Sequence, residues 1–358
     1  MKLQENIPLA PLTTLQVGGP ARYFVEAGSE AEINEGLSWA AQRRLPLFVL
    51  GGGSNLVVAD EGWPGLVLKV ALPGVRHEGQ GGNRVFYAGA GENWDEFVAL
   101  TVSKGCAGLE CLSGIPGTVG GTPVQNVGAY GQEVSQTITT VRVLEIATGK
   151  IRELSNSECG FRYRTSIFNT RERDRYIVLD VGYRLKQNGQ PSLEYADLKE
   201  YFARAAYSPT LQQVRDAVRK IRQNKGMLLV AGDEDCRSAG SFFKNPLVSE
   251  AEAARIQRLA GQRGPGKALP RYPGQDGMVK LSAAWLVEQS GFHKGYSRGP
   301  VGISRKHALA IVNRGGATAG DVIALKDEVQ KKVFDLWGVR LQPEPVFVGF
   351  ASESVEPG

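Results

Sequence analysis

The sequence predicts an α+β protein of two or three domains. Its 358 residues exceed what one hydrophobic core usually serves. Some segments carry apolar residues at helical spacing, whereas others are short apolar runs typical of strands. Glycine is abundant, at 45 residues, and gathers in loops without a fixed period. Several tight loops in which the backbone approaches a ligand are therefore expected.

The first predicted element is a helix over residues 29–44. A capping-box pattern starts it at Ser29, and Ile33, Leu37 and Ala41 fall on one face. Further elements follow in chain order: strands at 47–50, 56–59, near 66–70 and near 85–88, a helix near 93–104, strands near 141–146 and 177–185, and a helix at 208–224 that starts at Ser208-Pro209.

The C-terminal part of the chain again mixes helices and strands. Its predicted helices lie near 249–261, 282–290 and 318–337. Its predicted strands lie at 308–312 and 345–349. A Gly/Asp-rich stretch at 226–240 suggests a domain boundary. We therefore separate residues 1–230 from residues 231–350, and expect a disordered tail at 351–358.

Composition excludes several classes of protein. The net charge of +5 comes without dense basic blocks, so a nucleic-acid partner is not expected. The four cysteines show no metal-ligand spacing, which predicts reduced structural thiols and no metal site. The N-terminus does not resemble a signal peptide, and no apolar run approaches about 18 residues. A cytoplasmic protein without a membrane partner is expected.

The first glycine-rich loop is LGGGSNLVV. Its residues Gly51, Gly52, Gly53, Ser54 and Asn55 lie between two predicted strands. Consecutive glycines permit positive φ, so successive N–H groups can converge on an anion, and the serine and asparagine add donors. This chemistry suits a pyrophosphate. A simple β-turn remains the alternative.

The second loop, at residues 108–133, is GLECLSGIPGTVGGTPVQNVGAYGQE. Only Glu110 and Glu133 are charged, which is unusual for a solvent loop. We interpret it as backbone wrapped around a large, flat dinucleotide. The run GIPGTVGG at 114–121 lacks the GxGxxG spacing of a Rossmann fold, so another architecture is expected to hold a nucleotide.

Both loops, together with TTLQVGGPARYF at 13–24, resemble the UDP-N-acetylenolpyruvoylglucosamine reductases, in order from about residue 3 to 350. The resemblance implies a FAD-binding domain of the vanillyl-alcohol-oxidase (PCMH) type, with subdomains at 1–70 and 71–230, and a substrate-binding domain at 231–350. Gly51–Asn55 would hold the FAD pyrophosphate. Further implied FAD contacts are Ser113, Gly114, Ile115, Pro116, Gly117, Gly120, Gly121, Gln125, Asn126, Gly128 and Ala129.

Two charged residues stand in distinctive surroundings. Arg164 lies in CGFRYRTSIF at 159–168, and its planar fork suits a carboxylate, although an arginine between aromatic residues is usually a surface residue. Glu344 is held between Pro343 and Pro345, although most glutamates are simply exposed. The resemblance assigns Arg164 to the enolpyruvyl carboxylate and Glu344 to polarisation of the double bond.

Ser241 is the candidate acid. It lies in SAGSFFKNP at 238–246, without a nucleophile elbow and without a histidine nearby in sequence. A hydroxyl can donate its proton where the alkoxide is tolerated, but the residues alone favour a helix or turn cap. The resemblance implies that Ser241 protonates C2 of the substrate after hydride from the flavin reaches C3.

Four residues match substrate-binding positions of the family: Tyr163, Tyr195, Lys225 and Asn245. Tyr195 matches a tyrosine loop that closes over the nucleotide in type I members, although packing on a local helix explains it equally well. The chain departs from the family pattern in two places. Residues 226–240 exceed the commonest spacing, which weakens the assignment of Lys225, and Asn169 stands where lysine is common.

The resemblance therefore implies a monomeric flavoenzyme with non-covalent FAD. NADPH would reduce the flavin, and the enol ether of UDP-N-acetylenolpyruvoylglucosamine would then become the lactyl ether of UDP-N-acetylmuramate for peptidoglycan synthesis. Two alternatives remain open. One is an oxidase or dehydrogenase of a sugar, lactone or alcohol on the same scaffold, and the other is a non-catalytic nucleotide-sugar sensor.

Overall fold

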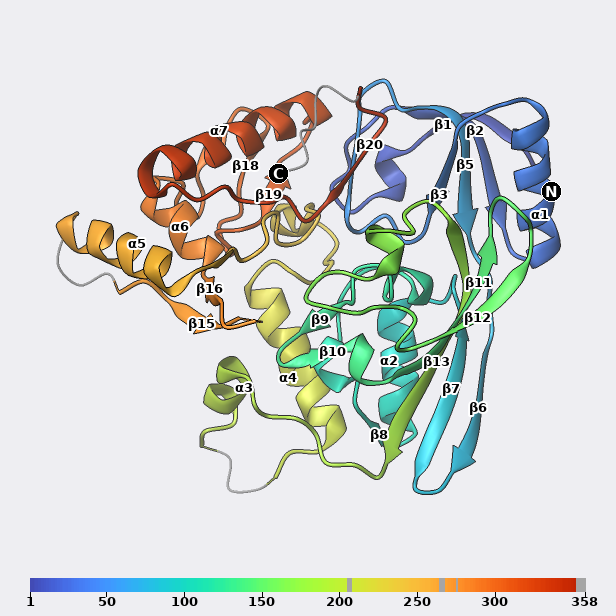
Figure 1. Ribbon diagram of the computed structural model, residues 1–358, viewed down its shortest axis with the longest axis horizontal. Helices are drawn as coiled ribbons and strands as arrows, with labels where there is room; N and C mark the ends of the chain where they lie inside the picture. Colours follow the sequence, from blue (N-terminus) through green and yellow to red (C-terminus); the bar gives the residue numbers. More distant parts are fainter. Residues whose placement is uncertain (205–207, 264–267, 275, 352–358) are drawn as a thin grey trace. The chain divides into compact units, whose positions relative to one another are not determined.

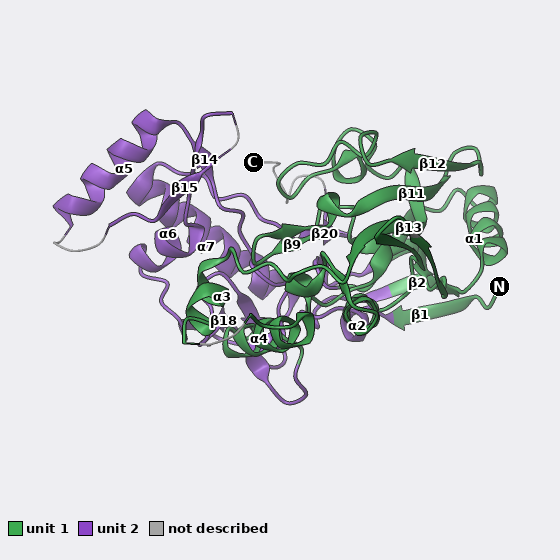
Figure 2. Ribbon diagram, turned by 90° about the horizontal axis from the view of Figure 1, so that it is seen from below, with its two compact units in different colours: residues 1–7, 21–53, 63–229 green, residues 8–20, 54–62, 230–358 purple. Residues whose placement is uncertain are grey.

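The computed structural model describes residues 1–204, 208–263, 268–274 and 276–351 (Figure 1). The chain divides into two compact units, coloured separately in Figure 2. Unit 1 comprises residues 1–7, 21–53 and 63–229, and unit 2 comprises residues 8–20, 54–62 and those from 230 onward. The separation of residues 1–70 from 71–230 remains a prediction. Residues 352–358 of the predicted tail lie outside the described residues.

Unit 1 contains a four-stranded sheet in the order β1-β2-β5-β3, parallel from β2 through β5 to β3. The strands are β1 (Gln4–Pro8), β2 (Pro20–Ala27), β5 (Trp63–Val70) and β3 (Leu47–Leu50). The strand predicted at 47–50 is thus confirmed. The apolar run of β5 is buried at most positions, as expected for a strand inside a parallel sheet.

Helix α1 (Glu30–Gln42) lies against this sheet, and its first turn is capped by the predicted Ser29. Its buried positions are Ile33, Gly36 and Ala40, whereas Ala41 is exposed, so the predicted buried face is wrong at that end. The helical repeat places the three buried residues on one side. Glycine at 36 lets the helix approach the leucine side chains of β5.

A second, antiparallel sheet of unit 1 has the order β12-β11-β13-β7-β6, and β8 also pairs with β13. Its strands are β12 (Ile151–Ser155), β11 (Ile138–Glu145), β13 (Tyr176–Gln187), β7 (Asn83–Gly89), β6 (Val75–Gln80) and β8 (Cys106–Ala107). Helix α2 (Trp94–Ser103) packs on it: the rings of Trp94 and Phe97 lie 5.9 Å and 5.1 Å from that of Tyr183 in β13. Figure 1 shows these elements.

Helices α3 (Ala196–Tyr201) and α4 (Leu211–Asn224) complete unit 1 around a small core that includes Leu198 and Val214. The predicted start of α4 at Ser208 is wrong. Thr210 is its N-cap, because the Thr210 hydroxyl accepts from Gln213 N, whose side chain reaches back to Thr210 N.

Unit 2 has three helices among its described residues: α5 (Glu250–Gln262), α6 (Ala283–Gln289) and α7 (Ala319–Trp337). Its strands form the groups β14 (Leu247–Val248), β16 (Val279–Leu281) and β15 (Arg271–Pro273); β17 (Ser297–Arg298), β18 (Val301–Ile303) and β19 (Ile311–Asn313); and the parallel pair β4 (Leu56–Val58) and β20 (Val346–Val348). The three helices are confirmed, but the strand predicted at 308–312 begins only at Ile311.

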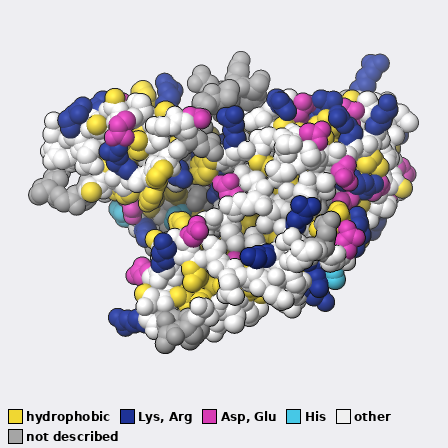
Figure 3. All heavy atoms as spheres, turned by 60° about the horizontal axis from the view of Figure 1, so that its bottom comes forward, with side chains coloured by type: hydrophobic (Ala, Val, Ile, Leu, Met, Phe, Trp, Pro, Cys, Tyr) yellow, Lys and Arg dark blue, Asp and Glu magenta, His cyan; other side chains and the backbone are white. Residues whose placement is uncertain are grey.

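Two short N-terminal segments belong to unit 2 because they supply its core. Leu15 and Val17 come from residues 8–20, and Val57 comes from β4; all three are buried among the side chains of the C-terminal helices. Among the described residues, no helix combines the length and the hydrophobicity needed to cross a membrane. On the face drawn in Figure 3, basic and acidic side chains are interspersed, as on an ordinary solvated surface.

Candidate active site

The two glycine-rich loops meet inside unit 1. A Cβ at Gly52 would stand 2.5 Å from Gly117 Cα, so no larger residue fits at position 52 without moving the second loop. A Cβ at Gly51 would stand 3.2 Å from Thr118 Oγ1. Gly53 and Gly117 adopt positive φ, of 65° and 124°, which glycine allows at little cost. The loops predicted to share one ligand are therefore neighbours.

The junction of the loops contains an unsatisfied donor. Thr118 Oγ1 is buried and has no hydrogen-bond partner among the described residues. A buried hydroxyl without a hydrogen-bond partner is unfavourable unless a ligand or a water molecule accepts its hydrogen bond. At Gly121 the protein leaves open space, since a Cβ there would meet no atom within 4 Å. A hydroxyl, loop backbone and open space fit an oxygen-rich group such as a pyrophosphate.

Gly114, another predicted FAD contact, is fixed from both sides by charged side chains. Its N–H donates to Asp95 Oδ1 at 2.6 Å, and its carbonyl accepts from Arg222 Nε at 3.1 Å. Arg222 also donates to Met227 O at 2.7 Å. The main chain of the second loop is thus held at Gly114 by side chains from helices α2 and α4.

Asp95 is the centre of this support. It accepts from Arg215 at 2.5 Å and also pairs with Arg219. Burial alone would raise the pKa of Asp95, but hydrogen bonds from Arg215 and Gly114 and the two guanidinium charges together hold this pKa below its ordinary value. This support was not predicted from the sequence, where its signals are an acidic residue in the first turn of a helix and arginines at helical spacing.

In the remainder of the second loop, the side chain of the predicted FAD residue Asn126 bonds other protein groups. The Asn126 side chain is buried, donates to Glu133 Oε2 at 2.8 Å and to Arg162 O at 3.1 Å, and accepts from Ser135 N at 3.1 Å. Gly128 and Ala129 form strand β9, which pairs with β10 (Gln132–Glu133). Gln125 is half-buried.

Arg164 lies against this same loop. Its Nη2 donates to Gly128 O at 2.8 Å, and its guanidinium stands 5.3 Å from the centre of the Tyr163 ring. Arg164 has a positive φ of 56°, and Asn169 Nδ2 holds its carbonyl at 3.1 Å. Asn169, at the departure from the family pattern, therefore fixes the backbone of the candidate arginine. Ser166 Oγ adds a 2.6 Å bond to Val124 O.

Two predicted substrate residues, Tyr195 and Lys225, meet around the buried Tyr130. The Tyr195 ring packs edge-on to the Tyr130 ring, with 5.4 Å between centroids, and 43% of Tyr195 is exposed. Lys225 Nζ lies 5.7 Å from the centre of the Tyr130 ring and forms an ion pair with Asp197. Burial raises the pKa of Tyr130, so its phenol is neutral.

In unit 2, Ser241 starts an extended segment held on both edges. Phe242 N donates to Leu309 O at 2.7 Å, and Phe242 O accepts from Glu344 N at 2.9 Å. Lys244 N also donates to Gln342 O at 2.9 Å. These bonds place the segments of Ser241 and Glu344, about a hundred residues apart in the sequence, side by side.

The Ser241 hydroxyl has a histidine partner. Ser241 Oγ lies 3.2 Å from His307 Nε2, and both side chains are half-buried. His307 lies 66 residues from Ser241 in the chain, so the absence of a histidine near Ser241 in sequence did not indicate this partner. Its position just before the predicted strand at 308–312 was the available signal.

Asn55 and Glu344 also come together. Asn55 Nδ2 donates to Glu344 O at 3.2 Å, and Val346 N donates to Asn55 O at 2.9 Å. Thr14 Oγ1 lies within hydrogen-bond distance of Ser54 O, at 3.3 Å, and of Ser238 O, at 2.6 Å. The end of the first glycine-rich loop is thereby attached to the two segments that carry Ser241 and Glu344.

Asn245 has a structural contact of its own. Its Oδ1 accepts from Ala283 N at 2.9 Å, at the first turn of α6. Each unit thus assembles part of the predicted site. Unit 1 holds the glycine contacts with Arg164, Tyr195 and Lys225, whereas unit 2 holds Ser241, Glu344 and Asn245. Among the described residues, no group of three or more His, Cys, Asp or Glu side chains is arranged to hold a metal ion.

The fold and the loops define an FAD-binding protein. A family model described as FAD binding domain matches residues 21–155, and one described as UDP-N-acetylenolpyruvoylglucosamine reductase, C-terminal domain, matches residues 232–348. The reductase of that name from Thermobifida fusca is 49% identical over 349 residues, covering 96% of this chain and 97% of that protein. The corresponding reductase of Streptomyces coelicolor is 45% identical over 97% of this chain and 90% of its own length.

The chain therefore belongs to the UDP-N-acetylenolpyruvoylglucosamine reductase family. A solved structure agrees: the crystal structure of the reductase from Thermus caldophilus matches with a TM-score of 0.67 and 27% identity, over 97% of this chain and 99% of that one. The predicted fold class, α+β with a FAD-binding domain and a C-terminal α/β domain, is confirmed, and the vanillyl-alcohol-oxidase type of the first domain stays a prediction.

Proposed function

We propose that the chain reduces UDP-N-acetylenolpyruvoylglucosamine to UDP-N-acetylmuramate in peptidoglycan synthesis, with FAD as cofactor and NADPH as reductant. The observation that carries the proposal for the site is the cluster in unit 2. Ser241 Oγ lies 3.2 Å from His307 Nε2, on a segment bonded through its backbone to that of Glu344. A reductase of an enol ether needs such a placed proton donor.

The two glycine-rich loops would hold FAD. Gly51–Asn55, with the Thr118 hydroxyl, are assigned to the pyrophosphate, and Gly121 faces open space for the ligand. The Asn126 side chain is engaged by protein groups, so its contribution to the cofactor would come through the backbone. When bound, FAD supplies the hydride chemistry between NADPH and the substrate.

Ser241 would supply the proton. Its hydroxyl donates to C2 of the enolpyruvyl group, and His307 Nε2 orients Oγ and can return a proton to it. Glu344, fixed between two prolines and bonded through its backbone to Phe242, would polarise the double bond. Arg164, held on Gly128 and Tyr163, would bind the substrate carboxylate and stabilise the charge that develops there. Arg164 and Ser241 belong to different units, so their meeting at one alkene is part of the proposal.

The nucleotide part of the substrate is assigned to Tyr195, Lys225, Asn245 and Tyr163. Lys225 is a suitable phosphate contact because its ammonium is oriented by Asp197 and by the face of Tyr130. Tyr195 is exposed beside it and could cover a bound nucleotide. We further propose that the protein is a cytoplasmic monomer and that residues 1–70, 71–230 and 231–350 act as its three domains.

A spectrum tests the function directly. The purified protein should show flavin absorbance, lose it when NADPH is added, and regain it when UDP-N-acetylenolpyruvoylglucosamine follows. The flavin should also be released on acid precipitation, since its attachment is non-covalent. A colourless protein would support a nucleotide-sugar sensor. A reduced flavin that reacts rapidly with oxygen but not with the UDP-sugar would support an oxidase.

A further inference from the structure

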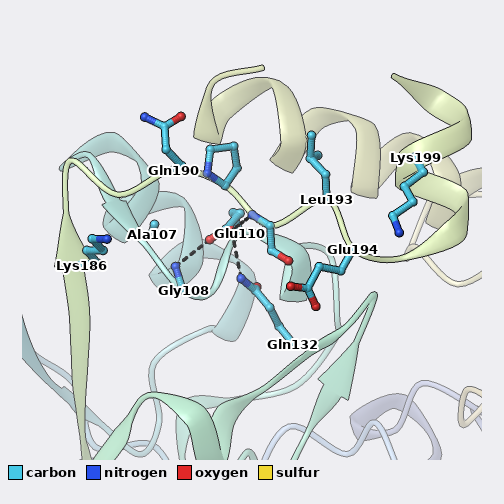
Figure 4. Close-up of a pocket in the computed structure, with 11 residues that line it drawn as sticks. Ala107, Gly108, Glu110, Gln132, Lys186, Gln190, Leu193, Glu194 and Lys199 are labelled. Atoms are coloured by element: carbon cyan, nitrogen blue, oxygen red, sulfur yellow. Dashed lines mark hydrogen bonds between the residues drawn. The ribbon is translucent and has the colours of Figure 1, made fainter. Parts of the chain in front are cut away.

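Glu110 is a buried carboxylate that the proposed reaction does not use. It is 1% exposed and lies on the floor of a pocket of about 500 Å³ in unit 1 (Figure 4). Its Oε2 accepts from Gly108 N at 2.7 Å, and its Oε1 accepts from Gln132 Nε2 at 2.9 Å and from Ser192 N at 3.0 Å. Three donors therefore converge on one carboxylate, which is what a buried charge requires.

These bonds join two parts of the chain that the reaction needs. On one side, Ser113, a predicted FAD contact, donates its hydroxyl to Glu110 O at 2.6 Å. On the other side, Ser192 lies three residues before Tyr195. Cys111 adds a second bond there, because its Sγ donates to Ser192 O at 3.5 Å. Residues 110 and 111 thus hold both the N–H and the carbonyl of Ser192.

Beyond Ser192 the chain is less well secured. Leu193 packs on the small core that contains Cys111, but Glu194 and Tyr195 are exposed. Figure 4 shows Glu110 bonded to Gly108 and Gln132, with Leu193 and Glu194 to its right. Among the described hydrogen bonds, the two at the Ser192 backbone are the last that join this segment to the second glycine-rich loop before Tyr195.

We propose that Glu110 is a positioning residue that ties the Tyr195 segment to the second glycine-rich loop, so that Tyr195 is held ready to cover the bound nucleotide. This inference rests on the proposed function, because Tyr195 is assigned to the substrate only there. Without the tie, binding must order the segment again, and ordering one residue corresponds to about tenfold in affinity.

The test compares Glu110→Gln, Tyr195→Ala and the double variant in the full chain with FAD. Glutamine keeps the shape but presents an amide NH₂ to some of the three donors. The dissociation constant of UDP-N-acetylmuramate is measured by calorimetry, which needs no turnover. We expect Glu110→Gln to raise this dissociation constant about tenfold. In the Tyr195→Ala background, the same change should raise it less than about twofold, because coupled residues are non-additive.

Glu194→Gln is the matched control. It removes a carboxylate from the same pocket, next to Tyr195, and should leave the dissociation constant unchanged. Flavin content should be normal in every variant, since Asp95 and Arg222 hold Gly114 independently. If Glu110→Gln does not fold, Cys111→Ala removes the second bond to Ser192 and carries the same test, with a smaller rise.

Two outcomes would overturn the inference: an unchanged dissociation constant in Glu110→Gln, or effects of the two substitutions that simply add. Failure of the proposed function would be distinguishable, because the unaltered protein would then not reoxidise its NADPH-reduced flavin with UDP-N-acetylenolpyruvoylglucosamine, whatever its affinity for UDP-N-acetylmuramate. A purely structural role for Glu110 would lower stability while leaving the coupling to Tyr195 at zero.

Discussion

The two units prepare their parts of the site in different ways. In unit 1 the candidate FAD loops require glycine at positions such as Gly52 and Gly121, where a side chain would fill space. Their backbone is also held by charged side chains such as Asp95. In unit 2 the site depends on a single hydroxyl, that of Ser241, placed by an extended segment and one histidine. Changes at these glycines should therefore alter flavin retention and stability, whereas changes at Ser241 and its histidine should alter the proton step alone.

The largest effect is expected for Ser241→Ala. NADPH should still bleach the flavin, because the substitution leaves unit 1 intact. Reoxidation by UDP-N-acetylenolpyruvoylglucosamine should slow by about 10²–10⁴, the usual loss when a general acid is removed. Stopped-flow absorbance of the flavin measures both halves. Ser249→Ala, which removes an exposed helix-cap hydroxyl in the same unit, should reoxidise normally. Normal turnover in Ser241→Ala would refute the assignment of the acid.

Gly52→Ala tests the opposite half of the comparison. Its new Cβ would stand 2.5 Å from Gly117 Cα, so the two loops must separate. We expect loss of bound flavin and a decrease of about 1–3 kcal/mol in the free energy of unfolding, as for other overpacked sites. Flavin content per protein and urea unfolding measure the two effects.

Two other glycines separate packing from ligand contact. Gly121→Ala places its Cβ where no protein atom lies within 4 Å, so the flavin-free protein should keep its stability while flavin affinity falls. Gly261→Ala, in α5, also meets nothing within 4 Å and should retain flavin. Full flavin content in both Gly52→Ala and Gly121→Ala would contradict the placement of the cofactor on these loops.

Asp95→Asn should weaken the support behind Gly114. The change removes the charge partner of Arg215 and Arg219, and we expect about 1.5–3 kcal/mol less stability at neutral pH. The folded-state pKa of Asp95 is below its ordinary value of 3.8. Because the folded-state pKa is lowered, the ionised carboxylate stabilises the folded protein fully at pH values above its ordinary pKa. This stabilisation is lost as the pH falls through the folded-state pKa. Urea unfolding should therefore show the difference shrinking below about pH 4.

Asp216→Asn provides the control for this pH dependence. Asp216 is exposed on the same helix α4 and pairs only with Gln212 among the described hydrogen bonds. Its replacement should change stability by less than about 0.5 kcal/mol at any pH. A difference for Asp95→Asn that persists unchanged at pH 3 would show that its charge does not hold the loop.

The sequence predicted local features well and long-range partners poorly. Ser29 is predictable as a cap because a cap bonds a residue three positions away. The glycine-rich loops were recognised because composition alone marks them. Asp95 with Gly114, and Ser241 with His307, depend on which segments the fold brings together, so spacing along the chain does not pair them.

The roles of Ser241, Arg164 and Glu344 came from the family resemblance, not from local pattern. Without it, Ser241 would have been interpreted as a cap and Glu344 as a surface residue. The contacts of Thr14 are likewise not predictable from local sequence. Its contacts with Ser54 and Ser238 bind the N-terminal segment to unit 2, and no periodicity in residues 8–20 indicates that.

The smallest effect, and the one that tests unit 2 most finely, is expected for His307→Gln. Loss of one hydrogen bond to Ser241 Oγ should slow reoxidation by about 3- to 10-fold, the net value of such a bond, with flavin content and bleaching by NADPH unchanged. His293→Gln alters an exposed histidine of the same unit and should have no effect. A loss as large as that of Ser241→Ala would mean that His307 and the hydroxyl act as one unit in the proton step. An unchanged rate would mean that the hydroxyl acts without its partner, and unit 2 would then depend on backbone placement just as unit 1 does.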